Sequence, residues 1–531
     1  AAFIPVSWRA VVICQGADAP RSPVRTVDWS GIIPIHPATH PRRRPAGMSD
    51  EVLSYDPYAL PPDEILEPPA TLWAALRKIG PGIILAGTIV GSGELILTTS
   101  LGAKHGFVFL WLILFSCVIK VFVQIELGRY AISSGKPTLG AFNDLPGRGS
   151  RAHPLVWWWF AMMLCSVFQL GGMTGGVGQA LHLGFPSVAE QTAQLLDGSL
   201  PALAALVRDR PEFPWAVATC LVTMALIYRG TYRRIEWLTT FIVISVTLIT
   251  VTGAAALGFT DYPIHVSDLL SGLEMRIPPE GLAVGFAVFG ITGVGATELF
   301  YYPYWCLEKG YARYAGKAED TAAWERRARG WVRVLHLDAW VSMVVFTVST
   351  VAFYLMGAAV LHPQGLDPKG RELIDTLSKM YIGPFGAWTR ILFLIGAGAV
   401  LFKTLYLACA ANARLITDFL NLNGFVNVTT AARRATVISR FCLVFPALAL
   451  TFYLIARDPT FMVTVGGVAQ GATLPMIALV TLYLRHAKVD RRLQPWLITD
   501  ILLVIAVVSI LVVAAYVVPS QIQGLIKMVR G

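Results

Sequence analysis

Runs of apolar residues long enough to cross a lipid bilayer as helices recur along this chain. A helix needs about 20 apolar residues to span the hydrocarbon core, and segments of that kind follow one another between residues 78 and 518. The chain is 55% hydrophobic and only 14% charged over 531 residues, with a mean hydropathy of +0.60. Soluble proteins of this size carry more charge on their surfaces. The sequence therefore predicts an all-α integral membrane protein with one membrane domain.

The apolar segments divide into eleven candidate spans. Their approximate boundaries are 78–104, 107–130, 155–183, 213–229, 236–259, 281–306, 332–360, 384–413, 437–456, 461–485 and 495–518. Lys and Arg concentrate in alternate loops, whereas the loops between them are poorer in bases and often acidic. The positive-inside rule therefore predicts a cytoplasmic N-terminus and, with an odd number of spans, an external C-terminus. The net charge of +10 follows from this topology and does not indicate nucleic-acid binding.

The two ends of the chain differ from the apolar middle. We expect residues 1–70 to be a disordered N-terminal tail, 71–520 a single transporter domain and 521–531 a short C-terminal tail. Residues 1–47 end in a basic, Pro-rich stretch and contain no apolar core of signal-peptide type. We expect the native protein to start at Met48, with a disordered basic tail as the alternative.

Two spans carry a glycine-rich interruption followed by a glutamate. The first span contains "GTIVGSGELIL" (87–97), and the sixth contains "FGITGVGATELF" (289–300). Transporters built from inverted repeats place discontinuous helices at corresponding positions of their two halves, and the substrate binds at these breaks. Carboxylates inside a membrane are costly and mark functional sites. We therefore predict helix breaks at the glycines of these two motifs, namely Gly91, Gly93, Gly293 and Gly295.

Short motifs along the chain resemble the Nramp family of divalent-metal transporters. They include "GPG" at 80–82, "LGAKHGF" at 101–107, "LGRYAISSGKPTLG" at 127–140, "YRRIEW" at 232–237, "FGITG" at 289–293, "ITDFL" at 416–420 and "ATLP" at 472–475. The resemblance covers about residues 77–518 and keeps the order and number of spans. It implies a LeuT-type fold of five-plus-five inverted repeats, with about eleven transmembrane helices and broken helices 1 and 6.

The resemblance also implies where a metal would bind. The family's first metal motif, Asp-Pro-Gly-Asn, falls on residues 91–94, and its second, Ala-x-x-Met, falls on residues 294–297. Here the thioether of the second motif is replaced by a hydroxyl, so the remaining donors are oxygens, which suit Mg²⁺ or Ca²⁺, or Mn²⁺ at the borderline. The candidate substrate- or metal-binding residues are Gly91, Glu94, Val294, Thr297 and Glu298.

The family's proton path is only partly retained. Its two acids in the third span fall on Gly172 and Gly175, which argues against proton coupling by the usual route. Its arginine of the ninth span is retained as Arg440. A glutamine of its tenth span falls on Gly467, and Gln470 lies one turn further on. Arg440 and Gln470 are therefore candidate coupling residues.

A lysine in the middle of the eighth span needs a partner, because an ammonium group inside a membrane is costly unless it is paired or wetted. Spans one, six and eight adjoin in the LeuT-type fold, so we expect Lys403 to pair with Glu94 or Glu298. We hypothesise that such a Glu–Lys pair stands in for a bound cation.

Two functions remain open from the sequence. The first is a secondary transporter of the family's symporter type that moves a divalent metal cation by alternating access. The alternative is the same fold carrying a non-metal small polar or organic solute, with Glu94, Glu298 and Lys403 as charge-pairing or proton-carrying groups. The chain has no H-E-x-x-H or G-x-S-x-G motif and no Cys-x-x-Cys, so we expect neither an enzyme, a resident cofactor, a zinc site nor disulfides. The expected partners are a lipid bilayer (plasma or inner membrane) and a small ion or solute.

Overall fold

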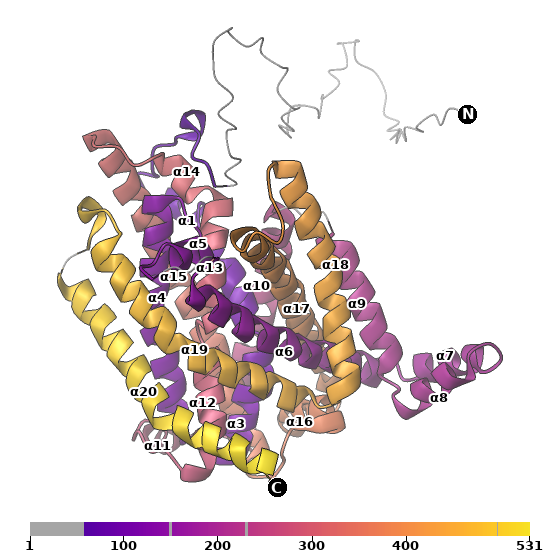
Figure 1. The fold of residues 1–531 in the computed structure, drawn as a ribbon. Coiled ribbons are helices and arrows are strands. Elements are labelled where there is room, and N and C mark those ends of the chain that lie inside the picture. The colour runs from indigo at the N-terminus through magenta and orange to yellow at the C-terminus, as the bar shows by residue number, and fades with distance from the viewer. Residues whose placement is uncertain (1–57, 148–150, 229–231, 496, 531) are drawn as a thin grey trace, which may run out of the picture. The chain divides into compact units, whose positions relative to one another are not determined.

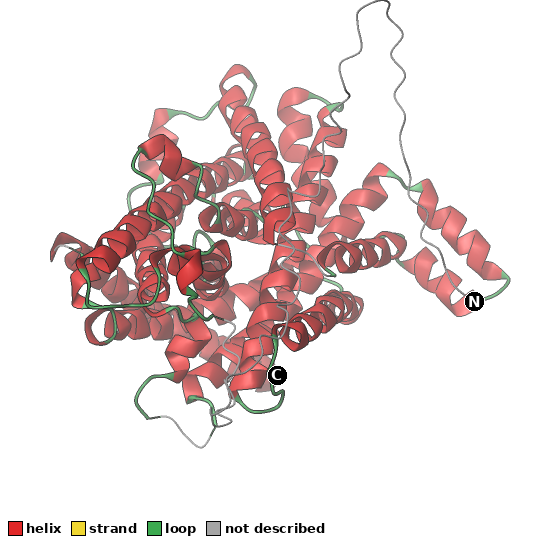
Figure 2. Ribbon diagram, turned by 90° about the horizontal axis from the view of Figure 1, so that it is seen from above, coloured by secondary structure: helices red, strands yellow, loops and turns green. Residues whose placement is uncertain are grey.

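The computed structural model describes residues 58–147, 151–228, 232–495 and 497–530, and all regular structure within these ranges is helical (Figures 1 and 2). Helices that match the eleven predicted spans follow in chain order. They are α2, η3 and α3 (Pro81–Ile89, Gly93–Thr98, Thr99–His105), α4 (Leu110–Ser134), α6 (Pro154–Gly184), α9 (Phe213–Ile227), α10 (Tyr232–Ala256), α12 and α13 (Leu282–Ile291, Ala296–Lys309), α15 and η6 (Ala322–Met356, Gly357–Leu361), α17 (Thr389–Leu422), α18 (Ala431–Ala456), α19 (Pro459–Ala487) and α20 (Leu497–Arg530).

Ten of the predicted spans are long and apolar enough, within the described residues, to cross a membrane. The fourth, α9, has 15 residues and is shorter than a full span. Short helices lie between the spans or before the first one. They are η2 (Pro62–Glu64), α1 (Leu72–Leu76), α5 (Thr138–Asn143), α7 (Ser187–Asp197), α8 (Pro201–Asp209), η4 (Leu257–Phe259), α11 (Val266–Ser271), η5 (Pro279–Gly281), α14 (Tyr311–Ala315), η7 (Gly370–Glu372), α16 (Leu373–Phe385) and η8 (Arg491–Leu493).

The helix starts follow local sequence signals. Thr430 caps α18 by accepting a hydrogen bond from the backbone N–H of Arg433 at 3.2 Å. Asp458 caps α19 in the same way, and Pro459 occupies the first position of that helix. These residues satisfy N–H groups that have no partner inside the helix, which fixes where each span begins.

The two interrupted helices occupy the centre of the bundle. The most apolar window of residues 81–105 is 94% buried and that of residues 279–309 is 83% buried, against 28% for the window of α18. The helices α4, α10, α15, α17 and α19 pack around them. A polar group at either break is therefore shielded from lipid, which is the condition under which irregular backbone is tolerated at membrane depth.

Both predicted breaks are present. The helix α2 ends at Ile89, the chain turns at Val90 and Gly91, and η3 continues as a π-helical turn from Gly93. The helix α12 ends at Ile291 and α13 begins at Ala296. Gly293 has a positive φ of 66°, and an added Cβ there would lie 2.8 Å from the Cα of Cys117, so only glycine fits this break.

The segment from Tyr58 to Thr71, here called the N-terminal strap, is ordered against the helix ends. The Tyr58 hydroxyl donates to Asp418 of α17 at 2.5 Å and accepts from Arg434 of α18 at 2.7 Å. The backbone N–H of Leu66 donates to the carbonyl of Tyr314 at 3.1 Å. The expectation of disorder up to residue 70 is therefore wrong for residues 58–70, because aromatic, apolar and acidic groups of the strap find partners on the bundle.

The strap yields a first prediction. Replacing Tyr58 with phenylalanine removes a hydroxyl that bonds two charged groups, and such hydrogen bonds contribute about 1.5–3 kcal/mol each. We expect faster hydrogen exchange in residues 58–66, measured by mass spectrometry, with little change in the spans. Tyr483→Phe, at an exposed position of α19, is the matched control. Unchanged exchange in the strap of the Tyr58→Phe protein would show that other contacts hold it.

At the other end of the chain, α20 continues to Arg530, so residues 521–530 are helical rather than a short tail. Residues 1–57, including Met48, lie outside the described residues.

Candidate functional site

A cavity of about 30 Å³ lies between the two breaks and three surrounding helices, α6, α17 and α19. A volume of this size holds about two water molecules. Oxygen-bearing side chains dominate the polar part of its wall. They are Thr88, Ser92, Ser166, Gln169, Thr297, Glu298, Tyr301, Thr404, Asn412 and Gln470.

A chain of hydrogen bonds connects the two breaks through this wall. Gln169 of α6 donates to the Ser92 hydroxyl at 3.2 Å and accepts from the amide of Gln470 at 3.0 Å. The Gln470 carbonyl oxygen lies 2.9 Å from the Thr297 hydroxyl, which is also 2.8 Å from a carboxylate oxygen of Glu298. One hydroxyl hydrogen is shared between these two acceptors. The acceptors therefore have spare capacity for a cation or a proton.

Three predicted residues with polar side chains meet at the cavity, namely Thr297, Glu298 and Gln470, and Gly93 also forms part of the wall. Thr297 and Glu298 lie in the first turn of α13, directly after the break. Both side chains face the cavity and are buried from the outside of the protein. Gly295 precedes them, and a Cβ there would lie 2.6 Å from Glu298 and 2.7 Å from Gln470. The glycine thus leaves room for the two side chains to converge.

Glu94 does not line the cavity. One of its carboxylate oxygens accepts from the backbone N–H of Gly91 at 3.1 Å, and the other lies 3.4 Å from the hydroxyl of Thr350 on α15. The side chain is fully buried. Of the two acids predicted for the site, only Glu298 is part of the cavity wall.

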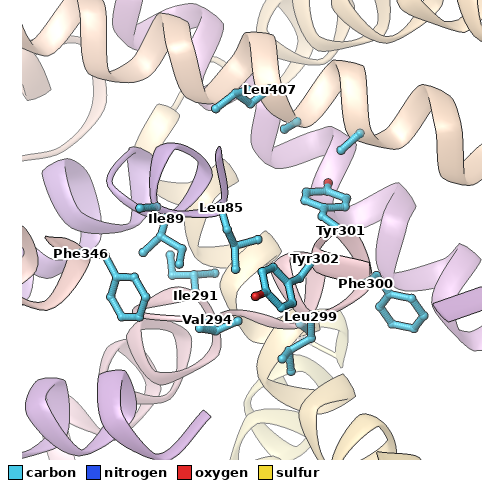
Figure 3. Close-up of a cluster of buried hydrophobic side chains, with 14 of the residues drawn as sticks. Leu85, Ile89, Ile291, Val294, Leu299, Phe300, Tyr301, Tyr302, Phe346 and Leu407 are labelled. Atoms are coloured by element: carbon cyan, nitrogen blue, oxygen red, sulfur yellow. The ribbon is translucent and has the colours of Figure 1, made fainter. Parts of the chain in front are cut away.

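Gly91 and Val294 also contribute no group to the cavity wall. An added Cβ at Gly91 would lie 2.2 Å from the Thr404 hydroxyl oxygen, so this glycine permits close packing of the break on α17. Val294 is fully buried, and Figure 3 shows it among apolar side chains that include Ile291 and Leu299. Both positions therefore shape the breaks.

The expected ion pair between Lys403 and a glutamate is not formed. The Lys403 ammonium donates to the carbonyl oxygen of Gly87 at 2.6 Å and to that of Val90. These carbonyls belong to the last turn of α2, where no helical N–H is available to them. The partial negative charge of a helix C-terminus stabilises a cation there, so the backbone takes the place expected for the carboxylate.

Arg440 lies outside the site. It is on the exposed face of α18, beside Arg433 and Val437, and contributes nothing to the cavity wall. Its position gives no support to a coupling role.

Several residues at the site were missed from the sequence. Gln169, Asn412 and Tyr301 line the cavity, and the Tyr301 hydroxyl donates to Asn412 at 3.0 Å. Lys120 of α4 is fully buried and bonds the end of α12. Gln169 and Lys120 interrupt otherwise apolar stretches, so the rule that polar residues inside a span mark functional positions would have found them.

The donor set is suited to a cation held mainly by neutral oxygens. Among the described residues, no group of three or more His, Cys, Asp or Glu side chains is arranged to hold a metal. The cavity instead combines one carboxylate with hydroxyl and amide oxygens, and the thioether of Met173 forms part of the same wall. Oxygen donors outnumber sulfur, which favours hard or borderline divalent ions.

Solved structures of transporters share this fold. A crystal structure of the Eremococcus coleocola manganese transporter, in complex with an aromatic bis-isothiourea compound, superposes with a TM-score of 0.60 at 16% identity, covering 87% of this chain and 90% of that one. Mhp1, a nucleobase-cation-symport-1 family transporter, gives 0.50 at 14% identity and covers 83% and 93%. The chain therefore has the LeuT-type fold that the sequence resemblance implied.

Sequence relatives are similar over most of the chain. The divalent metal cation transporter MntH of Caldanaerobacter subterraneus subsp. tengcongensis is 24% identical over 416 residues, which are 78% of this chain and 85% of that protein. The protein of the same name from Chromohalobacter salexigens is 24% identical over 314 residues, or 58% and 62%. The family model described as natural resistance-associated macrophage protein-like matches residues 82–520, and the chain therefore belongs to the Nramp family of multi-pass membrane proteins.

Proposed function

We propose that this protein transports a divalent metal cation across the membrane by alternating access, and that the cavity between the broken helices is the binding site. The observation that carries the proposal is the convergence of Thr297, Glu298 and Gln470 at the start of α13. Family membership and the names of the relatives, which are divalent metal cation transporters, support the same substrate class.

The chemistry of the wall indicates which ions to test. A carboxylate and several neutral oxygens suit Mg²⁺, Mn²⁺ and Ca²⁺. The cavity of about 30 Å³ admits a small ion with a water molecule. Transport of a divalent metal ion is therefore favoured over transport of a non-metal solute.

We also propose the orientation of the chain in the membrane and the coupling of transport. The loop charges favour a cytoplasmic N-terminus and an external C-terminus in a plasma or inner membrane, and residues 71–520 act as one transporter domain. The acids of the family's proton path are replaced by Gly172 and Gly175, so we infer transport without the usual proton symport. Substrate and lipid are the only partners this function needs.

Flux into liposomes tests the transport function. We expect purified protein in liposomes to take up at least one of Mn²⁺, Mg²⁺ and Ca²⁺ when a membrane potential is imposed, because each cycle moves positive charge. Uptake is measured with a metal-sensitive dye, and protein-free liposomes are the control. The proposal is rejected if none of the three ions moves at millimolar concentration while thermal unfolding shows that the protein is folded.

A further inference from the structure

The two half-helices at the breaks end in the same way. The helix α2 ends at Ile89. The carbonyls of Gly87 and Val90 at this end accept hydrogen bonds from a lysine ammonium group. The helix α12 ends at Ile291, and the corresponding carbonyls are those of Phe289 and Thr292. In each pair the second carbonyl belongs to the residue just after the helix, and the first lies three residues earlier.

A buried lysine from the other half of the fold binds each pair of carbonyls. Lys403, on α17, donates to the first pair, at 2.6 Å for Gly87. Lys120, on α4, donates to the second pair, at 2.7 Å and 2.5 Å, and the Ser116 hydroxyl donates to the same two carbonyls. The lysine of the second half thus binds the broken helix of the first half, and the lysine of the first half binds that of the second.

Both ammonium groups donate hydrogen bonds to uncharged oxygen atoms, and that of Lys120 also lies 5.0 Å from the ring centroid of Phe289. Lys403 and Lys120 are 1% and 0% exposed. Within the described part of the chain, the two ammonium groups donate hydrogen bonds to backbone carbonyls and to one hydroxyl, and to no carboxylate. A pair of backbone carbonyls at the negative end of a helix is also what an inorganic cation binds.

We propose that Lys120 and Lys403 are tethered counter-cations, each occupying the place at a half-helix C-terminus where transporters with discontinuous helices bind a coupled cation. The consequence is that the transport cycle requires no coupled monovalent cation. This consequence rests on the proposed transport function. The lysines are positioning residues, because they hold the broken ends in the geometry that exposes the cavity and do not line its wall.

The test separates charge from packing. In purified full-length protein, Lys403→Ala and Lys120→Ala leave a vacancy that faces the carbonyls, whereas Lys403→Met and Lys120→Met refill the space without charge. We expect NaCl, compared with choline chloride at equal ionic strength, to raise the Tm of the two alanine variants. The methionine variants, wild type and Lys488→Ala, at an exposed position after α19, should show no such difference.

Uptake of Mn²⁺ into liposomes provides the functional readout. We expect wild-type uptake to be equal in the two salts, and uptake by the alanine variants to fall about tenfold in choline chloride, as the loss of a charge-assisted hydrogen bond implies. NaCl should restore part of that loss in the alanine variants and none in the methionine variants.

Two results would overturn the inference. A Tm or an uptake rate of the wild type that rises with Na⁺ would show that a monovalent cation is still required. Uptake at the wild-type level by the methionine variants in both salts, with losses confined to the alanine variants and equal in both salts, would make the lysines packing groups only. If the alanine variants do not fold, the wild-type comparison decides. If wild-type protein takes up no Mn²⁺, the transport proposal fails for this ion, while the thermal measurements still decide the role of the lysines.

Discussion

Glu298→Gln should lower uptake of the divalent cation by about 100-fold or more, whereas Glu94→Gln should reduce it only slightly. Glu298 is the one carboxylate in the cavity wall, and a unit charge at 4 Å contributes about 4 kcal/mol at an effective dielectric of 20. Glutamine at position 94 keeps a carbonyl oxygen for the N–H of Gly91 and an amide for the hydroxyl of Thr350. Initial rates of uptake into liposomes, at several metal concentrations, measure the difference.

Thermal unfolding of both glutamine variants controls for misfolding. Each substitution keeps the size of the side chain, so similar Tm values are expected. The reverse result would be a larger loss for Glu94→Gln and uptake within about twofold of wild type for Glu298→Gln. A twofold change is too small for the loss of a ligand charge. That result would place the binding site on the α15 side of the first break.

Gly290→Ala should strongly lower the free energy of unfolding, although the substitution adds only one methyl group. The helices α12 and α19 cross here in backbone contact, and a Cβ at position 290 would lie 2.2 Å from the carbonyl oxygen of Gly467 and 2.7 Å from the backbone nitrogen of Gly471. Neither atom belongs to a side chain that can rotate away. Overpacking of this kind costs about 3 kcal/mol or more where the backbone has to shift.

Gly396→Ala in α17 is the matched control, because no atom lies within 4 Å of the added Cβ. Alanine there should leave the Tm unchanged or raise it, since alanine favours a helix over glycine by about 1 kcal/mol. The measurement is the Tm in detergent and the yield of monodisperse protein. Equal stability of the two variants would mean that α12 and α19 lie further apart than this structure places them.

The sequence was sufficient for the spans, the breaks and the family, because apolar runs reveal the spans, glycine placement reveals the breaks and short motifs reveal the family. It was insufficient for the direction in which Glu94 points. Ser92 lines the cavity, and a residue two positions later lies on the opposite side of a helix. The intervening π-helical turn from Gly93 to Thr98 shifts the faces further. A motif that names four consecutive residues cannot reveal which of them face the same way.

The partners of Lys403 could not be predicted for a different reason. We expected a carboxylate because side-chain charges are visible in a sequence, whereas the carbonyls of Gly87 and Val90 acquire their binding capacity only when α2 ends. The strap was missed because a Pro-rich, acidic segment has the composition of a disordered one. Tyr58 orders it through Asp418 and Arg434, which are 360 and 376 residues away along the chain.

The role proposed for the lysines at the two half-helix ends has a consequence for how much electrical work one cycle performs. A carrier whose counter-charges are part of its own chain moves only the two charges of its cargo, and the empty carrier returns without carrying an ion. Each elementary charge gains about 2.3 kcal/mol per 100 mV, so a divalent ion gains about 4.6 kcal/mol. That energy supports accumulation on the order of a thousandfold at 100 mV. Membrane voltage alone would then set the limit to which such a cell could concentrate the metal, independently of its sodium or proton gradients.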